Sequence, residues 1–457
     1  MCRFFTILTL FNYLSLYIQT EQTMTLPIII MVVLTANIPA SGINVSNAFS
    51  AQSSEGEEFN NTLMLHENKD LFRFAENYDN SFFSEWEKLY INALILNLRH
   101  KNAESNTVIN LLLDKYSQTI PDSLKLLLYE TRMKNSVNFF DYKDALYCTE
   151  YVLQNYSSLL DSAEDVDMKN SRVIWKAAEN IQKQTVEITG DSKIPLKKDL
   201  AGLINIPVKS AGVEEEFIFD TGANFSVVNE TYAKKMKLKI LDGKIQVGSI
   251  TGKSIASKLA YAELLEIGNV KLENVLFLVM PDESLSFAGG LYVINGIIGL
   301  PVIKEMKEVH IKNDEIYIPK QKTPGTLANM LIDGFVPAIE VIDGTDSLAF
   351  TFDTGAKATL LYSSYYKRNK TKIESKYEME EIEFGGAGGT VKVKGFRIKD
   401  IILRVGNSKI KLDDVRVVAE KIKDHDKSYF GNLGQDYMGE FSEMILNFED
   451  MYVDFKK

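Results

Sequence analysis

The sequence has few of the residues that build cross-linked or metal-based sites. Its 457 residues include only two cysteines, Cys2 and Cys148. Cys2 lies in an apolar N-terminal segment and Cys148 in a helical pattern, where a packed thiol is the ordinary arrangement, so no disulfide framework is expected. None of the four histidines has a partner at ligand spacing; they are His66, His100, His310 and His425. We therefore predict neither a metal site nor a cofactor.

Basic residues are in the minority. The chain has 51 Lys and Arg against 62 Asp and Glu, for a net charge of -11. No segment concentrates basic residues with interleaved aromatic ones, as nucleic-acid-binding grooves do, so nucleic acid is not an expected partner. With 45% hydrophobic and 11% aromatic residues, a chain of this length predicts a globular protein of roughly two to four domains.

The sequence also lacks an apolar run long enough to span a membrane. The runs over residues 4–18 and 26–38 each fall short of the roughly 20 residues required. The second run precedes the small residues of Pro39-Ala40-Ser41-Gly42, which is typical of a signal peptide, although Arg3 is the only basic residue before it. We expect residues 1–42 to direct export to the periplasm, cell surface or medium. A retained N-terminal anchor, which would then be the membrane contact, and a true start at Met24 stay open.

The first half of the remaining chain has a helical pattern. Residues 43–62 are largely polar and predict an exposed linker. Apolar residues then recur at helical spacing with short loops between them, which predicts an α-helical domain of antiparallel neighbours over residues 63–190. Residues 138–156, with Ala145 at a close-packing position, resemble the second half of a tetratricopeptide unit, whereas a plain helical bundle explains the same apolar stripe. A repeat scaffold of this kind would bind a protein partner.

From about residue 200 the pattern changes to short runs of Val, Ile, Phe and Tyr separated by glycine turns, which predicts an all-β region. This region contains an internal duplication. Residues 206–228 align with 336–361, and residues 295–303 align with 431–438. We predict two duplicated β lobes, over residues 200–322 and 323–457, and hence an α+β multidomain protein with an all-β bilobal part.

Each copy of the β region contains a similar motif, "FIFDTGANFSVV" at residues 217–228 and "FTFDTGAKATLL" at residues 350–361. In both, an aspartate (Asp220 or Asp353) ends an apolar strand and begins a Thr-Gly turn. An isolated buried carboxylate is unfavourable, so two of them at the junction of two lobes are expected to share a proton. Such a pair can activate a water with one carboxylate while the other polarises a carbonyl group. The pattern predicts amide hydrolysis by Asp220 and Asp353.

The residues that follow each aspartate suit this chemistry. The glycines permit close backbone approach, the threonine hydroxyls can form hydrogen bonds between the lobes, and the small alanines leave room for a substrate backbone. We expect these residues to support the active-site loops; they are Thr221, Gly222, Ala223, Thr354, Gly355 and Ala356.

These features resemble the aspartic peptidases of the pepsin and retropepsin type, in which each of two lobes supplies a hydrophobic-Asp-Thr-Gly loop. That family also has a hydrophobic-hydrophobic-Gly segment beside each catalytic loop. Ile297-Ile298-Gly299 matches it, and Asn432-Leu433-Gly434 matches in part, since Asn432 replaces an aliphatic residue. The Asp-Thr-Gly-Ala motif and the compact lobes resemble a fused pair of retropepsin-like lobes more closely than a pepsin chain. The resemblance covers residues 200–457 and implies an endopeptidase that acts on polypeptides.

A cleft of this kind needs a hairpin flap that excludes water. Residues 247–256 and 384–393 hold matching places in the two lobes, although neither carries the tyrosine of pepsin flaps. The predicted flap residues are Ser249, Ile250, Thr251, Gly386 and Ala387. The alternative function is a catalytically inactive or latent peptide-binding protein with a helical repeat scaffold. In the enzyme hypothesis the helices position the β lobes, restrict their substrates or act as a prosegment-like cover.

Overall fold

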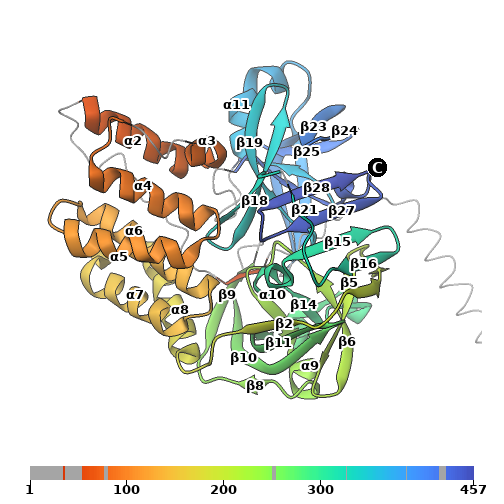
Figure 1. Ribbon diagram of the computed structural model, residues 1–457. Helices are drawn as coiled ribbons and strands as arrows, with labels where there is room; N and C mark the ends of the chain where they lie inside the picture. Colours follow the sequence, from red (N-terminus) through yellow and green to blue (C-terminus); the bar gives the residue numbers. More distant parts are fainter. Residues whose placement is uncertain are drawn as a thin grey trace, which may run out of the picture.

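The computed structural model describes residues 34–36, 54–76, 81–249, 254–325, 327–386, 389–420 and 429–457. A layer of helices lies beside two β lobes that follow one another along the chain (Figure 1). Among the described residues, no helix is long and apolar enough to cross a membrane. The predicted segment over residues 1–42 lies outside the described residues except for β1 (Leu34–Ala36), a short strand that pairs with the edge of β9 (Ile245–Ser249).

Consecutive helices of the N-terminal domain pack against one another, and capping boxes start two of them. Ser84 with Glu87 and Asp161 with Glu164 satisfy amide groups that the first turn of a helix leaves unpaired. Trp175 and Cys148 are buried in the core of this domain. The helices are α2 (Ser54–Glu67), α3 (Leu71–Glu76), α4 (Glu85–Leu98), α5 (Asn102–Tyr116), α6 (Asp122–Asn138), α7 (Tyr142–Asn155) and α8 (Ser162–Ala178).

The boundaries of the helical domain differ from the predicted ones at both ends. The linker predicted over residues 43–62 is helical from Ser54 on, because Phe59 and Leu63 on α2 are buried against the helices that follow. At the other end, β2 (Thr185–Ile188) pairs with β11 (Val270–Met280) of the first lobe, so the chain leaves the helices before residue 190. Tertiary packing, rather than the polarity of the surrounding residues, sets both limits.

The two lobes share one strand order. In the first lobe the central path is β9-β10-β11-β7-β14-β6-β5, and in the second it is β21-β22-β25-β20-β26-β19-β18. In each lobe a short strand runs parallel to the strand before the aspartate and antiparallel to the strand after it. The first-lobe strands are β5 (Ile204–Ser210), β6 (Val213–Phe219), β7 (Ser226–Asn229), β9, β10 (Ser254–Ile267), β11 (Val270–Met280) and β14 (Gly296–Ile298). The second-lobe strands are β18 (Val336–Asp343), β19 (Asp346–Phe352), β20 (Leu360–Leu361), β21 (Glu380–Gly386), β22 (Gly389–Ile398), β25 (Val415–Val418) and β26 (Gly431–Leu433).

A five-stranded sheet joins the lobes on the side away from the helices (Figure 1). Its central pair is β15 (Glu308–Lys312) of the first lobe and β27 (Glu443–Asn447) of the second, flanked by β16 (Glu315–Ile318) and β28 (Tyr452–Lys456), with β3 (Ser192–Pro195) at the edge. His310 is buried in this sheet and contacts Glu308 at 2.6 Å and Glu443 at 2.8 Å. A hydrogen-bonding contact, between His310 and Glu443, therefore crosses the boundary between the lobes.

The helical domain packs against both lobes. One hydrophobic cluster contains residues of α2 to α6 and of the second lobe, and another contains residues of α6 to α8 and of the first lobe. Polar contacts accompany each cluster. Lys69 forms an ion pair with Asp333 of the second lobe at 2.5 Å, and the buried Lys304 of the first lobe donates to the carbonyl oxygen of Asn138 on α6. The helices thus bridge the two lobes.

Candidate active site

The two aspartates lie at equivalent places where a central strand of each lobe ends. Asp220 follows β6, and its amide donates to the carbonyl oxygen of Ile298 at 3.0 Å. Asp353 follows β19, and its amide donates to the carbonyl oxygen of Leu433 at 3.3 Å. Both side chains are buried, with 0% and 2% exposure. The structure brings together the two aspartates and the adjacent hydrophobic-Gly segments that the sequence predicts to lie side by side.

Threonine hydroxyl groups connect the two aspartate loops. The Thr221 amide donates to Thr354 Oγ1 at 3.1 Å, and the Thr354 amide donates to Thr221 Oγ1 at the same distance. Each hydroxyl in turn donates to the carbonyl oxygen that ends the strand of the other lobe, Phe352 at 2.9 Å for Thr221 and Phe219 at 2.8 Å for Thr354. These reciprocal hydrogen bonds fix the position of one aspartate loop relative to the other.

The glycine of each loop faces the carboxyl group of the opposite lobe. A Cβ atom added at Gly222 would lie 2.6 Å from Asp353 Cγ, and one added at Gly355 would lie 2.5 Å from Asp220 Oδ2. Real side chains do not tolerate such distances, so this approach requires glycine. The two loops are therefore interlocked, and each aspartate lies against the turn of the other.

The two oxygens of each carboxyl group have different surroundings. The Oδ1 of Asp220 accepts from the amides of Gly222 at 2.8 Å and Ala223 at 3.2 Å, and the Oδ1 of Asp353 accepts from the amide of Gly355 at 2.7 Å. Both Oδ2 atoms are buried and have no hydrogen-bond partner within the described part of the chain. One oxygen of each pair is thus held by the protein, and the other is left for a proton, a water or a substrate.

Burial and the mutual charge of the pair shift its protonation. Burial first, and the charge of Asp353 second, raise the pKa of Asp220 well above its ordinary value. Burial raises the pKa of Asp353 to about 6. Because the two groups interact, the pair retains a proton to higher pH than a free aspartate would.

Two hydroxyl residues of the site were not predicted. Ser226 Oγ accepts from the amide of Gly299, and Thr359 Oγ1 accepts from the amide of Gly434, both at 3.2 Å. Each ties the strand after the aspartate to the glycine segment beside the loop. The signal was present in the sequence, since each hydroxyl follows its aspartate by the same offset (226 − 220 = 359 − 353 = 6).

The departure of Asn432 from the family pattern has a local cause. Thr351 on β19 donates a hydrogen bond to Asn432 Oδ1 at 2.6 Å, where the equivalent pair in the first lobe, Ile218 and Ile297, is apolar. Asn432 is buried at 1% exposure. The polar residue therefore has a polar partner on the adjacent strand, and β26 keeps the same position as β14.

Ala223 and Ala356 lie within the hydrophobic packing of this structure. Both residues are completely buried, and each belongs to a hydrophobic cluster that also contains residues of the helical domain. Near Ala223 the indole of Trp175 on α8 is stacked on Phe225, with ring centroids 6.1 Å apart and an interplanar angle of 20°. No pattern in the sequence predicts that helices pack against the two aspartate loops.

The predicted flap residues are described only in part. Ser249 ends β9, and Gly386 ends β21. Ile250, Thr251 and Ala387 lie outside the described residues. The two hairpins themselves are present, with Gly248 opposite Ser254 in the first lobe and Gly386 opposite Gly389 in the second.

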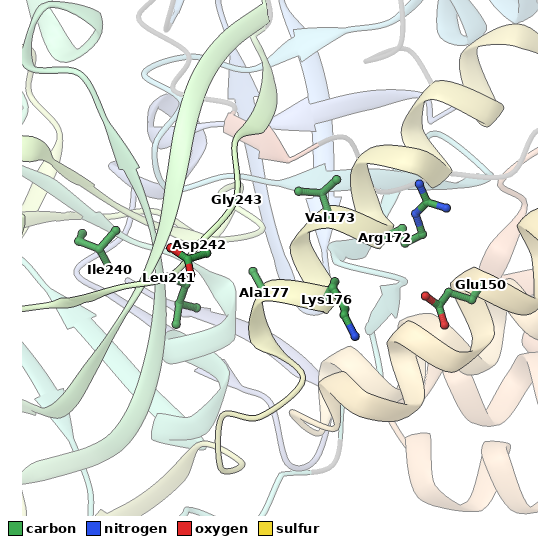
Figure 2. A pocket seen from close by; sticks show the side chains of 9 residues that line it. All are labelled: Glu150, Arg172, Val173, Lys176, Ala177, Ile240, Leu241, Asp242 and Gly243. Atoms are coloured by element: carbon green, nitrogen blue, oxygen red, sulfur yellow. The ribbon is translucent and has the colours of Figure 1, made fainter.

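A cavity of about 710 Å³ lies apart from the aspartates, between helices α7 and α8 and the segment that leads into β9 (Figure 2). Its lining residues are Glu150, Arg172, Val173, Lys176, Ala177, Ile240, Leu241, Asp242 and Gly243. None belongs to the two aspartate loops. Within the described ranges, no group of three or more His, Cys, Asp or Glu side chains is arranged to hold a metal ion.

Comparisons with known proteins indicate that the first lobe is aspartic protease-like. A family model described as "Aspartyl protease" matches residues 206–302, a range that includes Asp220 and Gly299. Among solved structures, basic 7S globulin from soybean shares 10% identity with a TM-score of 0.37, over 58% of this chain and 95% of that one. A retropepsin-like aspartic protease from Rickettsia conorii shares 19% identity with a TM-score of 0.20, over 30% of this chain and 94% of that one. No curated protein matches the chain. The chain thus contains an aspartic protease-like domain preceded by a helical domain.

Proposed function

We propose that the protein is an aspartic endopeptidase that hydrolyses peptide bonds with a water molecule held between Asp220 and Asp353. The observation that carries this proposal is the reciprocal approach of the two loops, in which each glycine lies against the carboxyl group of the other lobe. Two buried carboxyl groups so placed are unfavourable unless they share a proton. The arrangement thus supplies an acid and a base at one point.

The proposed hydrolysis uses the different surroundings of the Oδ1 and Oδ2 atoms of Asp220 and Asp353. The ionised carboxylate takes a proton from the water as its oxygen attacks the carbonyl carbon, and the protonated partner gives its proton to the carbonyl oxygen. A proton then passes to the amide nitrogen, the C–N bond breaks, and an amine and a carboxylic acid leave. Backbone amides of Gly222 and Gly355 hold the Oδ1 atoms throughout, which leaves the Oδ2 atoms to exchange protons.

Three finer parts of the proposal rest on sequence. The substrate is a polypeptide, because the paired loops resemble those of endopeptidases. The segment over residues 1–42 directs export or remains as an anchor. The helices of the N-terminal domain form a tetratricopeptide-like scaffold that binds a protein partner; the pairwise packing of successive helices from α4 to α8 is in keeping with such a scaffold.

A second candidate, a latent or catalytically inactive peptide-binding protein, is favoured by one observation. Both Oδ2 atoms, which must meet water and substrate in any hydrolysis, are shielded from solvent in this structure. An enzyme in this state must open before it acts.

Cleavage of casein tests the proposal. A chain beginning at Gly42 is assayed from acid to mildly alkaline pH, beside Asp353→Ala and with pepstatin added. Asp413→Ala, at an exposed aspartate with 82% side-chain exposure, is the control. We expect cleavage by the wild type and the control, and a loss of about a thousandfold in Asp353→Ala. Equal cleavage by both variants would refute the assignment of the dyad, and no cleavage by a folded wild type would favour the second candidate.

A further inference from the structure

Helix α8 is attached to strand β9, one of the two strands of the first-lobe hairpin. Asn170 Nδ2 donates to the carbonyl oxygen of Gln246 at 2.9 Å, and the Gln246 amide donates to Asn170 Oδ1 at 3.0 Å. A single side-chain amide thereby pairs with both backbone groups of one residue on the edge of β9, as the backbone of a neighbouring strand would. The contact involves residues 76 positions apart in the chain.

The same helix also contacts the catalytic loop. Trp175, five residues beyond Asn170, is stacked on Phe225, which lies between Ala223 and Ser226 in the loop that follows Asp220. Trp175 is completely buried, and Tyr142 of α7 is stacked on it with ring centroids 5.8 Å apart. The buried residues Ile245 and Val247 of β9 belong to the same hydrophobic cluster. The same helix thus touches both the hairpin, through Asn170, and the loop that bears Asp220, through Trp175.

The helical domain is anchored on the second lobe as well. The ion pair of Lys69 with Asp333 is largely buried, with side-chain exposures of 13% and 15%. Asn138 of α6 donates to the carbonyl oxygen of Gly334 at 2.7 Å. The domain therefore crosses from one lobe to the other on the side opposite the joining sheet (Figure 1).

A substrate must reach the two Oδ2 atoms, which the protein shields from solvent in this structure. The joining sheet fixes the lobes on one side, so access requires movement on the other, where the hairpin and the helices lie. The Asn170 pair is a polar contact between α8 and the hairpin that such a movement must break. Beside it the interface is incomplete, because the cavity lined by Val173, Ala177 and Leu241 separates α8 from the stem of the hairpin (Figure 2).

We propose that α8 is a latch on the flap of the first lobe and that Asn170 is its positioning residue. While the Asn170–Gln246 pair is formed, β9 is held against the helical domain and the aspartates remain shielded. Release of the pair frees the hairpin and admits an extended polypeptide. The gating part of this inference rests on the proposed function, whereas the attachment of β9 to α8 does not.

Hydrogen exchange tests the attachment without reference to activity. The exchange of peptides that cover β9 is measured by mass spectrometry in the full chain for the wild type, Asn170→Ala and Asn170→Asp. The matched control is Asn155→Ala, because Asn155 is exposed and its side chain donates within α7, to the carbonyl oxygen of Tyr151. We expect about fivefold faster exchange in Asn170→Ala, since the Gln246 amide loses its acceptor. Asn170→Asp keeps the acceptor and should show a smaller increase, and the control should show none.

Cleavage of an unfolded protein by the same variants tests the gating. If opening limits access, kcat/KM rises about five- to tenfold in Asn170→Ala, because a larger fraction of molecules is open. The pH profile stays unchanged, since the aspartates are untouched.

The outcomes separate the two claims. Unchanged exchange in β9 overturns the latch, and so does faster exchange with an unchanged or lower kcat/KM in an active enzyme. Faster exchange in β9 with no cleavage by any variant upholds the attachment and counts against the proposed peptidase instead.

Discussion

Thr221 and Thr354 exchange two hydrogen bonds across the boundary between the lobes, from the amide of each to the hydroxyl oxygen of the other at 3.1 Å. Both residues are completely buried. The relative position of Asp220 and Asp353 therefore depends on this pair, and the joining sheet on the far side supplies only the coarse arrangement of the lobes. Several expected outcomes rest on this interlocked geometry.

Replacement of Thr354 by valine should loosen the dyad. Valine keeps the shape of the side chain but leaves the Phe219 carbonyl and the Thr221 amide without a partner, so we expect the free energy of unfolding to fall by about 2 to 4 kcal/mol. Thr354→Ser keeps the hydroxyl and should lose much less. Chemical denaturation of both variants measures the difference, and equal values for valine and serine would show that the hydroxyl contributes nothing.

Replacement of Gly222 by alanine should disable the site without unfolding the protein. The added Cβ would lie 2.6 Å from Asp353 Cγ, so the carboxyl group must shift, and kcat/KM is expected to fall about a hundredfold. Gly190→Ala is the matched control, because its added Cβ meets nothing closer than Asn269 Nδ2 at 3.6 Å. Circular dichroism confirms folding in both. Full activity in Gly222→Ala would contradict the interlocked loops.

The rate of cleavage should depend on pH through the shared proton. We expect the rate to rise as the pair gives up the first of its two protons, near pH 6, where burial has raised the pKa of Asp353. The rate should fall again when Asp220 ionises, because burial and the Asp353 charge raise its pKa further. A profile of kcat/KM from about pH 3 to 9 measures both limbs. An optimum at pH 3 that is lost by pH 5 would be inconsistent with these shifts.

The same pair should make stability depend on pH. A carboxyl group whose pKa is raised in the folded state binds its proton more tightly there, so its contribution is complete below about pH 3.8 and is lost as pH rises through the folded value. Asp220→Asn carries no such charge and should exceed the wild type in free energy of unfolding by about 1 to 3 kcal/mol at pH 7.5.

At pH 4 we expect that difference to disappear. Denaturation at the two pH values measures it, with Asp413→Asn, at an exposed position, as the control. A stabilisation of equal size at both pH values would point to packing rather than to charge.

The ion pair between Lys69 of the helical domain and Asp333 of the second lobe should give the opposite pH dependence of stability. Burial acts to raise the pKa of Asp333, but the charges of Lys69 and His66, with the hydrogen bonds from Lys69 and Tyr429, together outweigh it and hold that pKa well below its usual range. The stabilisation is therefore present above about pH 3.8 and is lost as pH falls below it. Asp333→Asn should cost about 3 kcal/mol at pH 7, because it leaves Lys69 largely buried without its partner, and less in acid.

Asp400→Asn provides the comparison for this ion pair. Asp400 pairs with Lys411 at 2.9 Å, but both side chains are more than half exposed, so its loss should cost less than about 1 kcal/mol. A similar cost for the two variants in thermal and chemical denaturation would mean that the Lys69 pair does not anchor the helices.

The sequence by itself determined the features that repeat or recur along the chain. Local pattern suffices to predict the apolar period of the helices, the alternation of strands and turns, and the two copies of the Asp-Thr-Gly motif. Each of these features lies within a short segment. The duplication then placed Asp220 opposite Asp353, with Gly299 and Gly434 at equivalent positions within their own lobes, because two copies of one lobe must bring equivalent loops together. For the same reason, Ser226 and Thr359 lay within reach of prediction through their shared offset.

Only the tertiary structure decided how the helical domain meets the lobes. The contacts of Asn170 with Gln246, of Trp175 with Phe225 and of Lys69 with Asp333 join segments far apart in the chain. No local pattern specifies such partners, since an exposed asparagine or a core tryptophan satisfies its own helix equally well in many arrangements. Burial of Phe59, Ala223 and Ala356 likewise depends on what packs against them, because side chains become core only when a second surface covers them.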